Sequence, residues 1–103
     1  MSAMQAVVLR VEDYEGTRTV RSPVPITIGR APTATLVVPD AQVSRMHARI
    51  DLSDGVLSLL DLGSRNGTLL NARPIDGAAA LETGDEIDIG TTRIVYAGVG
   101  AWK

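Results

Sequence analysis

The sequence predicts an all-β domain, a sandwich or a barrel built from short strands. Its 103 residues contain many short runs rich in β-branched side chains. Gly, Pro or Asp-Gly signals separate these runs at intervals of roughly eight to twelve residues, which is typical of such folds. No segment has the length and periodicity of an ordinary helix. A chain of this length suits one hydrophobic core, so we expect a single domain over residues 1–103, with its core over about 5–97 and a Gly-rich tail over 98–103.

The first forty residues predict two pairs of short strands. An acidic, Gly-containing stretch at 12–16 separates a β-rich run from an alternating one, as in a hairpin. Pro23 and Pro25 then interrupt the pattern, and Pro is confined to edges or starts of strands within sheets. We therefore expect strands over 5–11, 17–21, 24–28 and 35–38, with the third at an edge or at the entry to a new strand.

The segment 43–53 fits a helical and an extended pattern in part. Four apolar or His positions have helical spacing, but the eight residues from Met46 to Ser53 alternate without a miss between apolar and polar. The longer match favours a strand. Asp54-Gly55 then predicts a hairpin turn into an inner strand over 56–62, which is apolar on nearly both faces.

The stretch 60–71 places Asn66-Gly67 between two apolar runs, which predicts a tight turn at the tip of a hairpin. Turn signals fill 71–77, and the four residues 78–81 are too few to sustain a helix. Trp102 is expected either to pack on the end of the fold or to remain in solvent. Further strands are predicted over 69–70, 86–89 and 93–97.

Composition excludes several classes of function. The net charge of −2 disfavours nucleic-acid binding, which depends on many Lys and Arg contacts to phosphates. No apolar run approaches eighteen residues, so no membrane insertion is expected. The N-terminus lacks the pattern of a secretory signal, and we take the cytoplasm as the expected location. With no Cys and one His, neither a thiolate nor a His-based metal site is predicted, and no cofactor motif occurs.

Two clusters could suggest chemistry but have simpler explanations. Ser44 and His47 resemble a nucleophile and a base, yet their odd spacing in an extended segment directs them to opposite faces. The acidic residues Asp85, Glu86 and Asp88 lack the spaced ligands and the Gly of a Ca²⁺ loop, and they fit a solvated strand face better. The chain is therefore predicted not to be an enzyme.

Capture of an anion fits the remaining polar signals better. Arg30 follows Gly29 at the end of a predicted strand, where a turn can project its guanidinium outward. Ser44 offers a hydroxyl group beside Arg45, and the loop 64–67 offers donors that can form an anion-binding nest. Each loop by itself reads as an ordinary exposed loop, but together they predict an anion site.

These blocks occur together in one known family. In the order and spacing of four blocks, this chain resembles the forkhead-associated (FHA) domain, a phosphothreonine-recognition module. The blocks are Gly29-Arg30, Ser44-Arg45-x-His47, Asp61-x-x-Ser64-x-Asn66-Gly67-Thr68 and Asn71. The resemblance extends through the following strands to residue 97. It implies a sandwich of two twisted antiparallel sheets with binding loops at one end. It also implies a partner that contains phosphothreonine, such as a Ser/Thr kinase or its substrate.

The resemblance also implies roles for single residues. Arg30 would be the main phosphate ligand, and Ser44 would bond a phosphate oxygen. Arg65 would touch the phosphate or its rim, Asn66 would bond the peptide main chain, and Arg45 would belong to the same phosphopeptide-binding set. Structural support of the loops would come from Gly29, His47, Gly67, Thr68 and Asn71. The alternative is an FHA-like scaffold whose protein interactions do not depend on phosphate.

Overall fold

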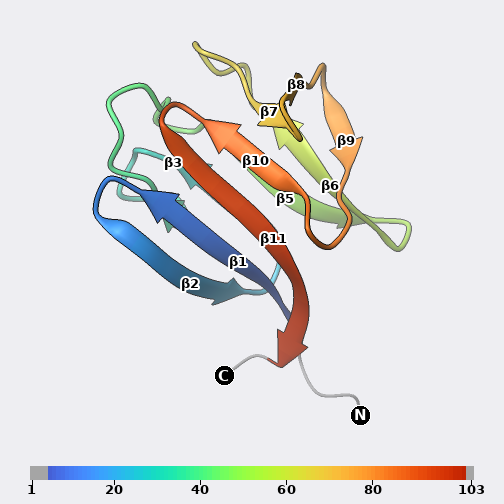
Figure 1. Cartoon of the computed structure of the whole chain (residues 1–103). Coiled ribbons are helices and arrows are strands. Elements are labelled where there is room, and N and C mark those ends of the chain that lie inside the picture. The colour runs from blue at the N-terminus through green and yellow to red at the C-terminus, as the bar shows by residue number, and fades with distance from the viewer. Residues whose placement is uncertain (1–4, 102–103) are drawn as a thin grey trace.

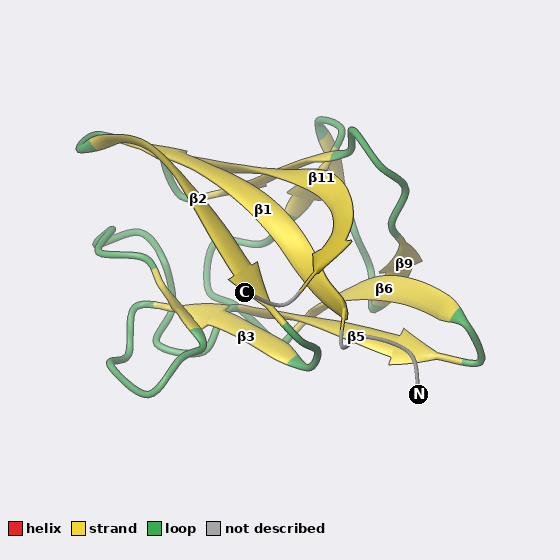
Figure 2. Ribbon diagram, turned by 90° about the horizontal axis from the view of Figure 1, so that it is seen from below, coloured by secondary structure: helices red, strands yellow, loops and turns green. Residues whose placement is uncertain are grey.

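The computed structural model describes residues 5–101, which form two β-sheets packed face to face (Figures 1 and 2). The six-stranded sheet has the order β2-β1-β11-β10-β7-β8 and the five-stranded sheet the order β4-β3-β5-β6-β9. The strands are β1 (Gln5–Asp13), β2 (Gly16–Ser22), β3 (Ile26–Gly29), β4 (Leu36–Val37), β5 (Ala48–Ser53), β6 (Val56–Asp61), β7 (Leu69–Leu70), β8 (Arg73–Pro74), β9 (Ala78–Ala80), β10 (Glu86–Ile89) and β11 (Thr92–Ala101). The predicted all-β sandwich is confirmed, with one parallel pair, β3–β4, among antiparallel ones.

The core lies between the two sheets and is built from alternate residues of their strands. In β1, Val7, Leu9 and Val11 point inward, while Arg10 between them is exposed. In β3, Ile26 and Ile28 do the same from the opposite sheet. Such alternation follows from the period of two along a strand, which directs successive side chains to opposite faces.

Strand β11 runs further than the sequence predicted. Its last four residues, 98–101, pair with residues 5–8 of β1, so the assignment of 98–101 to a tail is wrong. The register shifts between Val8 and Leu9, and Gly98 has φ +109° at that point. Gly98, predicted from the sequence to end the strand, is part of a β-bulge, where glycine is common. Trp102 lies outside the described residues.

The segment 43–47 is a loop, which contradicts the predicted strand over 43–53. Strand β5 begins only at Ala48. Met46, which the alternation placed on the core face, is 38% exposed. The backbone carbonyls of Ser44 and Arg45 accept hydrogen bonds from Arg30 and Ala31, so this loop folds over the end of β3 instead of continuing the ladder.

The connection between β6 and β7 is not a hairpin, which corrects the prediction for 60–71. Strand β6 belongs to the five-stranded sheet and β7 to the six-stranded one, so residues 62–68 cross between layers. By contrast, the predicted Asp54-Gly55 hairpin is confirmed, with φ +52° and +78° at its two central residues. Residues 73–74 and 78–80 add two short strands, β8 and β9, where only turn signals or a helical tendency were apparent.

Three connecting loops gather at one end of the sandwich, as the FHA resemblance implied (Figure 1). They join β3 to β4, β4 to β5, and β6 to β7. The two ends of the described chain, Gln5 and Ala101, are paired at the other end. The three loops meet because β3, β5 and β6 are neighbours in one sheet. Residues 5–101 contain no helix that could span a membrane.

Candidate functional site

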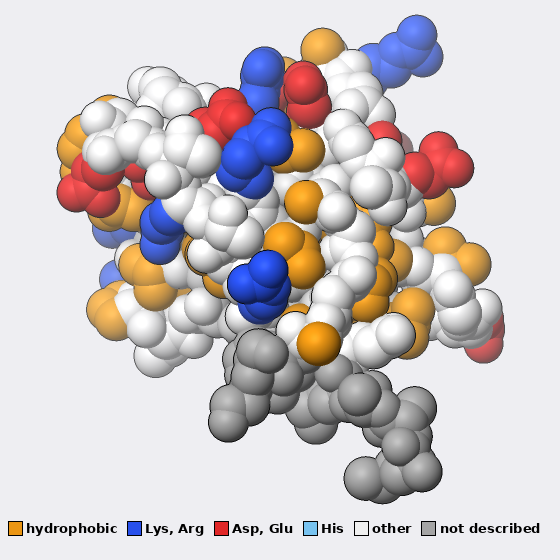
Figure 3. All heavy atoms as spheres, turned by 60° about the horizontal axis from the view of Figure 1, so that its bottom comes forward, with side chains coloured by type: hydrophobic (Ala, Val, Ile, Leu, Met, Phe, Trp, Pro, Cys, Tyr) orange, Lys and Arg blue, Asp and Glu red, His pale blue; other side chains and the backbone are white. Residues whose placement is uncertain are grey.

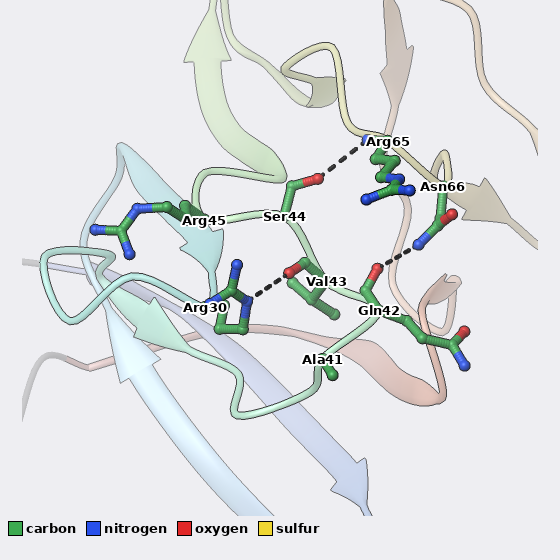
Figure 4. Close-up of a pocket in the computed structure, with 8 residues that line it drawn as sticks. All are labelled: Arg30, Ala41, Gln42, Val43, Ser44, Arg45, Arg65 and Asn66. Atoms are coloured by element: carbon green, nitrogen blue, oxygen red, sulfur yellow. Dashed lines mark hydrogen bonds between the residues drawn. The ribbon is translucent and has the colours of Figure 1, made fainter.

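The three loops enclose an open cavity of about 490 Å³ (Figure 4). All five residues predicted to bind a phosphopeptide line it, although they come from positions 30 to 66 of the chain. Three of the lining side chains are arginines and none is acidic, so the cavity is strongly cationic. The lining residues are Arg30, Ala41, Gln42, Val43, Ser44, Arg45, Arg65 and Asn66.

Arg30 reaches the cavity from the end of β3, where the loop 43–47 packs closely against the preceding residue, Gly29. At Gly29 an added Cβ atom would collide with the backbone carbonyl of Arg45, so only glycine allows the two segments to come this close. The Arg30 backbone nitrogen donates to the Ser44 carbonyl at 3.0 Å, and its side-chain Nε donates to the Val43 carbonyl at 3.1 Å. This second bond orients the guanidinium and leaves its two terminal nitrogens available to a ligand (Figure 4).

Ser44 and Asn66 connect the loops across the cavity. The Ser44 hydroxyl oxygen accepts a hydrogen bond from the Arg65 backbone nitrogen at 3.0 Å, which leaves the hydroxyl proton available for a ligand. Asn66 donates its Nδ2 to the Gln42 carbonyl at 2.8 Å. The amide oxygen of Asn66 therefore remains available to accept a bond from a peptide N–H.

His47 is fully buried beneath the cavity and joins two of the loops. Its Nδ1 accepts a hydrogen bond from the Ser44 backbone nitrogen at 3.1 Å. Because a backbone N–H can only donate, Nδ1 is unprotonated and Nε2 carries the proton, which it donates to the Gly67 carbonyl at 2.8 Å. The imidazole thus contacts the backbone of Ser44, not its hydroxyl group. It has the geometry of a structural brace and not of a base activating a nucleophile.

Asp61 organises the loop 62–68 from its first turn. One carboxylate oxygen accepts bonds from the hydroxyl groups of Ser64 and Thr68, at 2.6 and 2.7 Å, and the other accepts the backbone nitrogens of Gly63 and Ser64. Burial by itself raises the pKa of Asp61, but these four hydrogen bonds outweigh it and hold the pKa below its ordinary value. Thr68 is buried, and Gly67, with φ +83°, donates its nitrogen to the Ser64 hydroxyl.

Asp40 anchors the other wall of the cavity. Its carboxylate is buried and accepts bonds from the side chain and backbone of Thr91, from the Thr92 hydroxyl and from the Gln42 backbone nitrogen. Desolvation raises the pKa of Asp40, yet these bonds together lower it below its ordinary value. The carboxylate lies so close to Gly90 that an added Cβ there would approach Oδ2 to 2.8 Å. The turn between β10 and β11 therefore fixes residues 40–42.

Asn71 lies outside the lining of the cavity. It has φ +50° in the turn between β7 and β8. Its Nδ2 donates to Asp85 at 3.0 Å, and its Oδ1 accepts the Glu86 backbone nitrogen at 2.9 Å. These contacts fit a brace between that turn and the start of β10. Within residues 5–101, no three His, Cys, Asp or Glu side chains are placed to hold a metal ion.

Sequence reasoning missed several residues that shape the cavity. Gln42 and Val43 contribute through backbone carbonyls, which have no signature in the side-chain pattern. Ala41 lines the cavity without a polar group. Asp40 had a usable signal, because an Asp followed two residues later by a turn often accepts that turn's backbone nitrogens. Asp61 stood in the family motif, but its role as the acceptor that organises the loop that follows it was not predicted.

Comparisons with known proteins agree on one family. The model of the FHA domain matches residues 26–90. The oxoglutarate dehydrogenase inhibitor of Corynebacterium glutamicum is 41% identical over 70 residues, which cover 68% of this chain and 48% of the relative. The glycogen accumulation regulator GarA of Mycolicibacterium smegmatis is 43% identical over 68 residues, which cover 66% of this chain and 42% of the relative. The match thus spans less than half the length of either relative.

Solved structures extend the similarity to nearly the whole chain. The FHA domain of FhaA, solved with the intracellular domain of another protein, superposes with a TM-score of 0.77 at 36% identity, covering 91% of this chain and 99% of that one. EmbR of Mycobacterium tuberculosis, solved with a low-affinity phosphopeptide, superposes with a TM-score of 0.76 at 30% identity, covering 88% of this chain and 25% of that one. With the family model matched over well more than half of its residues, the chain belongs to the FHA domain family.

Proposed function

We propose that this chain is a non-catalytic module that binds phosphothreonine peptides in signalling by Ser/Thr protein kinases. The observation that carries the proposal is the cationic cavity, where Arg30, Ser44 and Asn66 come together from three loops. Family membership supports it, as does the phosphopeptide bound to the related EmbR. In this proposal the chain acts in the cytoplasm, and its partner is a phosphorylated kinase or kinase substrate.

The groups in the cavity complement a phosphothreonine side chain. A phosphoryl group brings about −1.5 to −2 charges at pH 7 and three strong acceptor oxygens. The free terminal nitrogens of Arg30 can donate two parallel charge-assisted bonds to it. The Ser44 hydroxyl donates a further bond, and Arg65 reaches the phosphate or its rim. Asn66 fixes the direction of the peptide through the main chain.

The exposure of the site to solvent sets the affinity that we expect for a phosphothreonine peptide. The cavity is open and its charged side chains are exposed, so each bond replaces one that water would make. A few charge-assisted bonds of this kind correspond to a dissociation constant on the order of micromolar, or about −8 kcal/mol. Affinity in that range suits a partner that is released when the phosphate is removed.

Substitution of Arg30 tests this proposal directly. Arg30→Ala should abolish binding of a phosphothreonine peptide in calorimetric titration, because it removes the main phosphate ligand. Arg21→Ala is the matched control, since Arg21 is an exposed arginine on β2, outside the cavity. Thermal unfolding of both variants shows whether the fold survives.

The titration includes peptides with phosphothreonine, phosphoserine and unmodified threonine at the same position. Undiminished binding to Arg30→Ala, with the fold intact, would contradict the proposal. Equal affinity for phosphorylated and unmodified peptides would instead support the alternative, a scaffold whose interactions do not depend on phosphate.

A further inference from the structure

The cavity holds more positive charge than one phosphothreonine can match. Three arginines line it without a single acidic residue, in a chain whose net charge is −2. A phosphoryl group at pH 7 brings about −1.5 to −2 charges, so about one positive charge remains uncompensated when the site is filled. Elsewhere Arg and acidic side chains are intermixed, as on the face in Figure 3. Like charges gathered without counter-charges repel one another, and an anionic ligand relieves that repulsion.

The side chain of Arg45, like that of Arg65, makes no hydrogen bond or ion pair that holds the described fold. It is exposed and has no such partner among residues 5–101. Arg30, by comparison, is tied to the Val43 carbonyl. The backbone of Arg45 is nevertheless held firmly, because its carbonyl accepts the Ala31 nitrogen at 3.1 Å and packs on Gly29. The guanidinium therefore extends from a fixed point and is free to bind a ligand.

Arg45 stands apart from the groups that would hold the main chain of the peptide. In Figure 4, Arg45 lies on one side of Arg30, while Arg65 and Asn66 lie together on the other. A phosphate held by Arg30 and Ser44, with the main chain against Asn66, leaves Arg45 facing a residue that flanks the phosphothreonine. The guanidinium of Arg45 is thus placed to interact with a charged group on that flanking side chain.

We infer that the site selects phosphothreonine peptides that carry a second oxyanion, a carboxylate or a further phosphate, on the flank that passes Arg45. This inference rests on the proposed function and specifies its ligand. The guanidinium offers paired donors to either oxyanion. Because the pair forms in a solvent-exposed position, a carboxylate there should tighten binding about two- to fivefold, with a larger gain for a doubly charged phosphate.

A set of matched peptides tests the inference on the full chain. Each peptide has one central phosphothreonine and carries Glu, phosphoserine or the neutral Gln at one of the three positions on either side. Affinities are measured by calorimetry for the wild type, for Arg45→Gln and for Arg21→Gln. The readout is the ratio of affinities for the charged and neutral peptides. A general loss of folding or of phosphate binding lowers both affinities and leaves their ratio unchanged.

We expect a gain from Glu and phosphoserine on one flank only, which falls to a ratio near one in Arg45→Gln and persists in Arg21→Gln. High salt should reduce the gain, since the pair is exposed. Binding that ignores flanking charge, or a gain that survives Arg45→Gln, would overturn the inference and leave phosphothreonine binding standing. Failure of every phosphorylated peptide to bind would overturn the proposed function and the inference together.

Discussion

The residue on which the cavity depends most contributes no functional group to it. Gly29 lies where β3 ends, and the backbone of Arg45 passes directly over the position that a Cβ atom would take. The loop 43–47 can therefore close on Arg30 and supply the carbonyls of Val43 and Ser44. This closure orients Arg30, so the position of its guanidinium depends on the absence of a side chain at Gly29.

Gly29→Ala should accordingly weaken both the fold and peptide binding. The new methyl group meets backbone, which cannot rotate away, so we expect a loss of about 1–3 kcal/mol in the free energy of unfolding. Chemical denaturation measures the loss, and titration with a phosphothreonine peptide measures the effect on the site. Gly100→Ala is the control, because its Cβ would meet no backbone and only one side-chain methyl group, on Val8 at 3.3 Å. Wild-type stability and affinity in Gly29→Ala would refute this role.

Among the elements, the loop 62–68 is held by charge and not by apolar packing. It crosses between the two sheets, and Thr68 is its one buried residue. Four hydrogen bonds to the Asp61 carboxylate define its path. The His47 imidazole fastens its far end through the Gly67 carbonyl. Arg65 and Asn66 lie between these two anchors, which gives exposed side chains a fixed backbone.

Asp61→Asn should destabilise the domain in a pH-dependent way. The folded-state pKa of Asp61 lies below its unfolded value of about 3.9. Its stabilisation is therefore fully present above that unfolded pKa, and it is lost as the pH falls through the lower, folded pKa. Hydrogen bonds to a charged group contribute about 1.5–3 kcal/mol, so we expect a loss of that order at pH 7.

Denaturation of both proteins at pH 7 and at pH 3 provides the test, with Asp76→Asn as the control. Asp76 is exposed and makes no hydrogen bond within the described residues. The difference between wild type and Asp61→Asn should shrink in acid, and a difference that stays constant between the two pH values would argue against the carboxylate as the anchor.

In the whole molecule, the candidate site and the longest strand pairing, that of β1 with β11, occupy different regions. The loops lie at one end of the sandwich, and the long pairing of β1 with β11 extends to the other (Figure 1). Residues 98–101 complete that pairing by covering residues 5–8. Exposed side chains at the loop end, such as Arg45 and Arg65, can therefore vary without altering that pairing.

A chain ending at Ala97 should be less stable than one ending at Ala101. The shorter chain exposes Val7, which is 5% exposed when paired with Val99. Exposure of such a side chain costs at least about 1.5 kcal/mol, which lowers the melting temperature of a domain of this size by about 6–12 °C. Calorimetric melting of the two chains measures the difference. Equal melting temperatures would show that the core ends near 97, as the sequence suggested.

Turn chemistry and strand periodicity predicted much of the fold, because both act over a few residues. The hairpin at Asp54-Gly55 is one example, since both residues adopt positive φ. Contacts between distant segments were not predictable in this way. The alternation of apolar and polar residues includes Met46. The backbone carbonyls of Ser44 and Arg45 just before it, however, accept hydrogen bonds from the residues that follow β3, which places this segment in a loop. Asn66-Gly67 indicated a turn but not that the chain there passes from one sheet to the other.

The candidate site was predictable as a set of side chains but not as a cavity. The family motif named Arg30, Ser44 and Asn66, and the structure places all three around one opening. The backbone carbonyls of Gln42 and Val43, which orient two of these side chains, depend on the folded path of the loop 40–47. No pattern of side chains encodes that path.

A two-dimensional ¹H–¹⁵N NMR titration tests most directly whether the cationic cavity binds phosphothreonine. A phosphothreonine peptide should shift the amide signals of Arg30, Ser44, Arg65 and Asn66, with little change along β2 or β9, and the unmodified peptide should leave all of them in place. Shifts spread over a sheet face, or equal shifts with both peptides, would contradict the account.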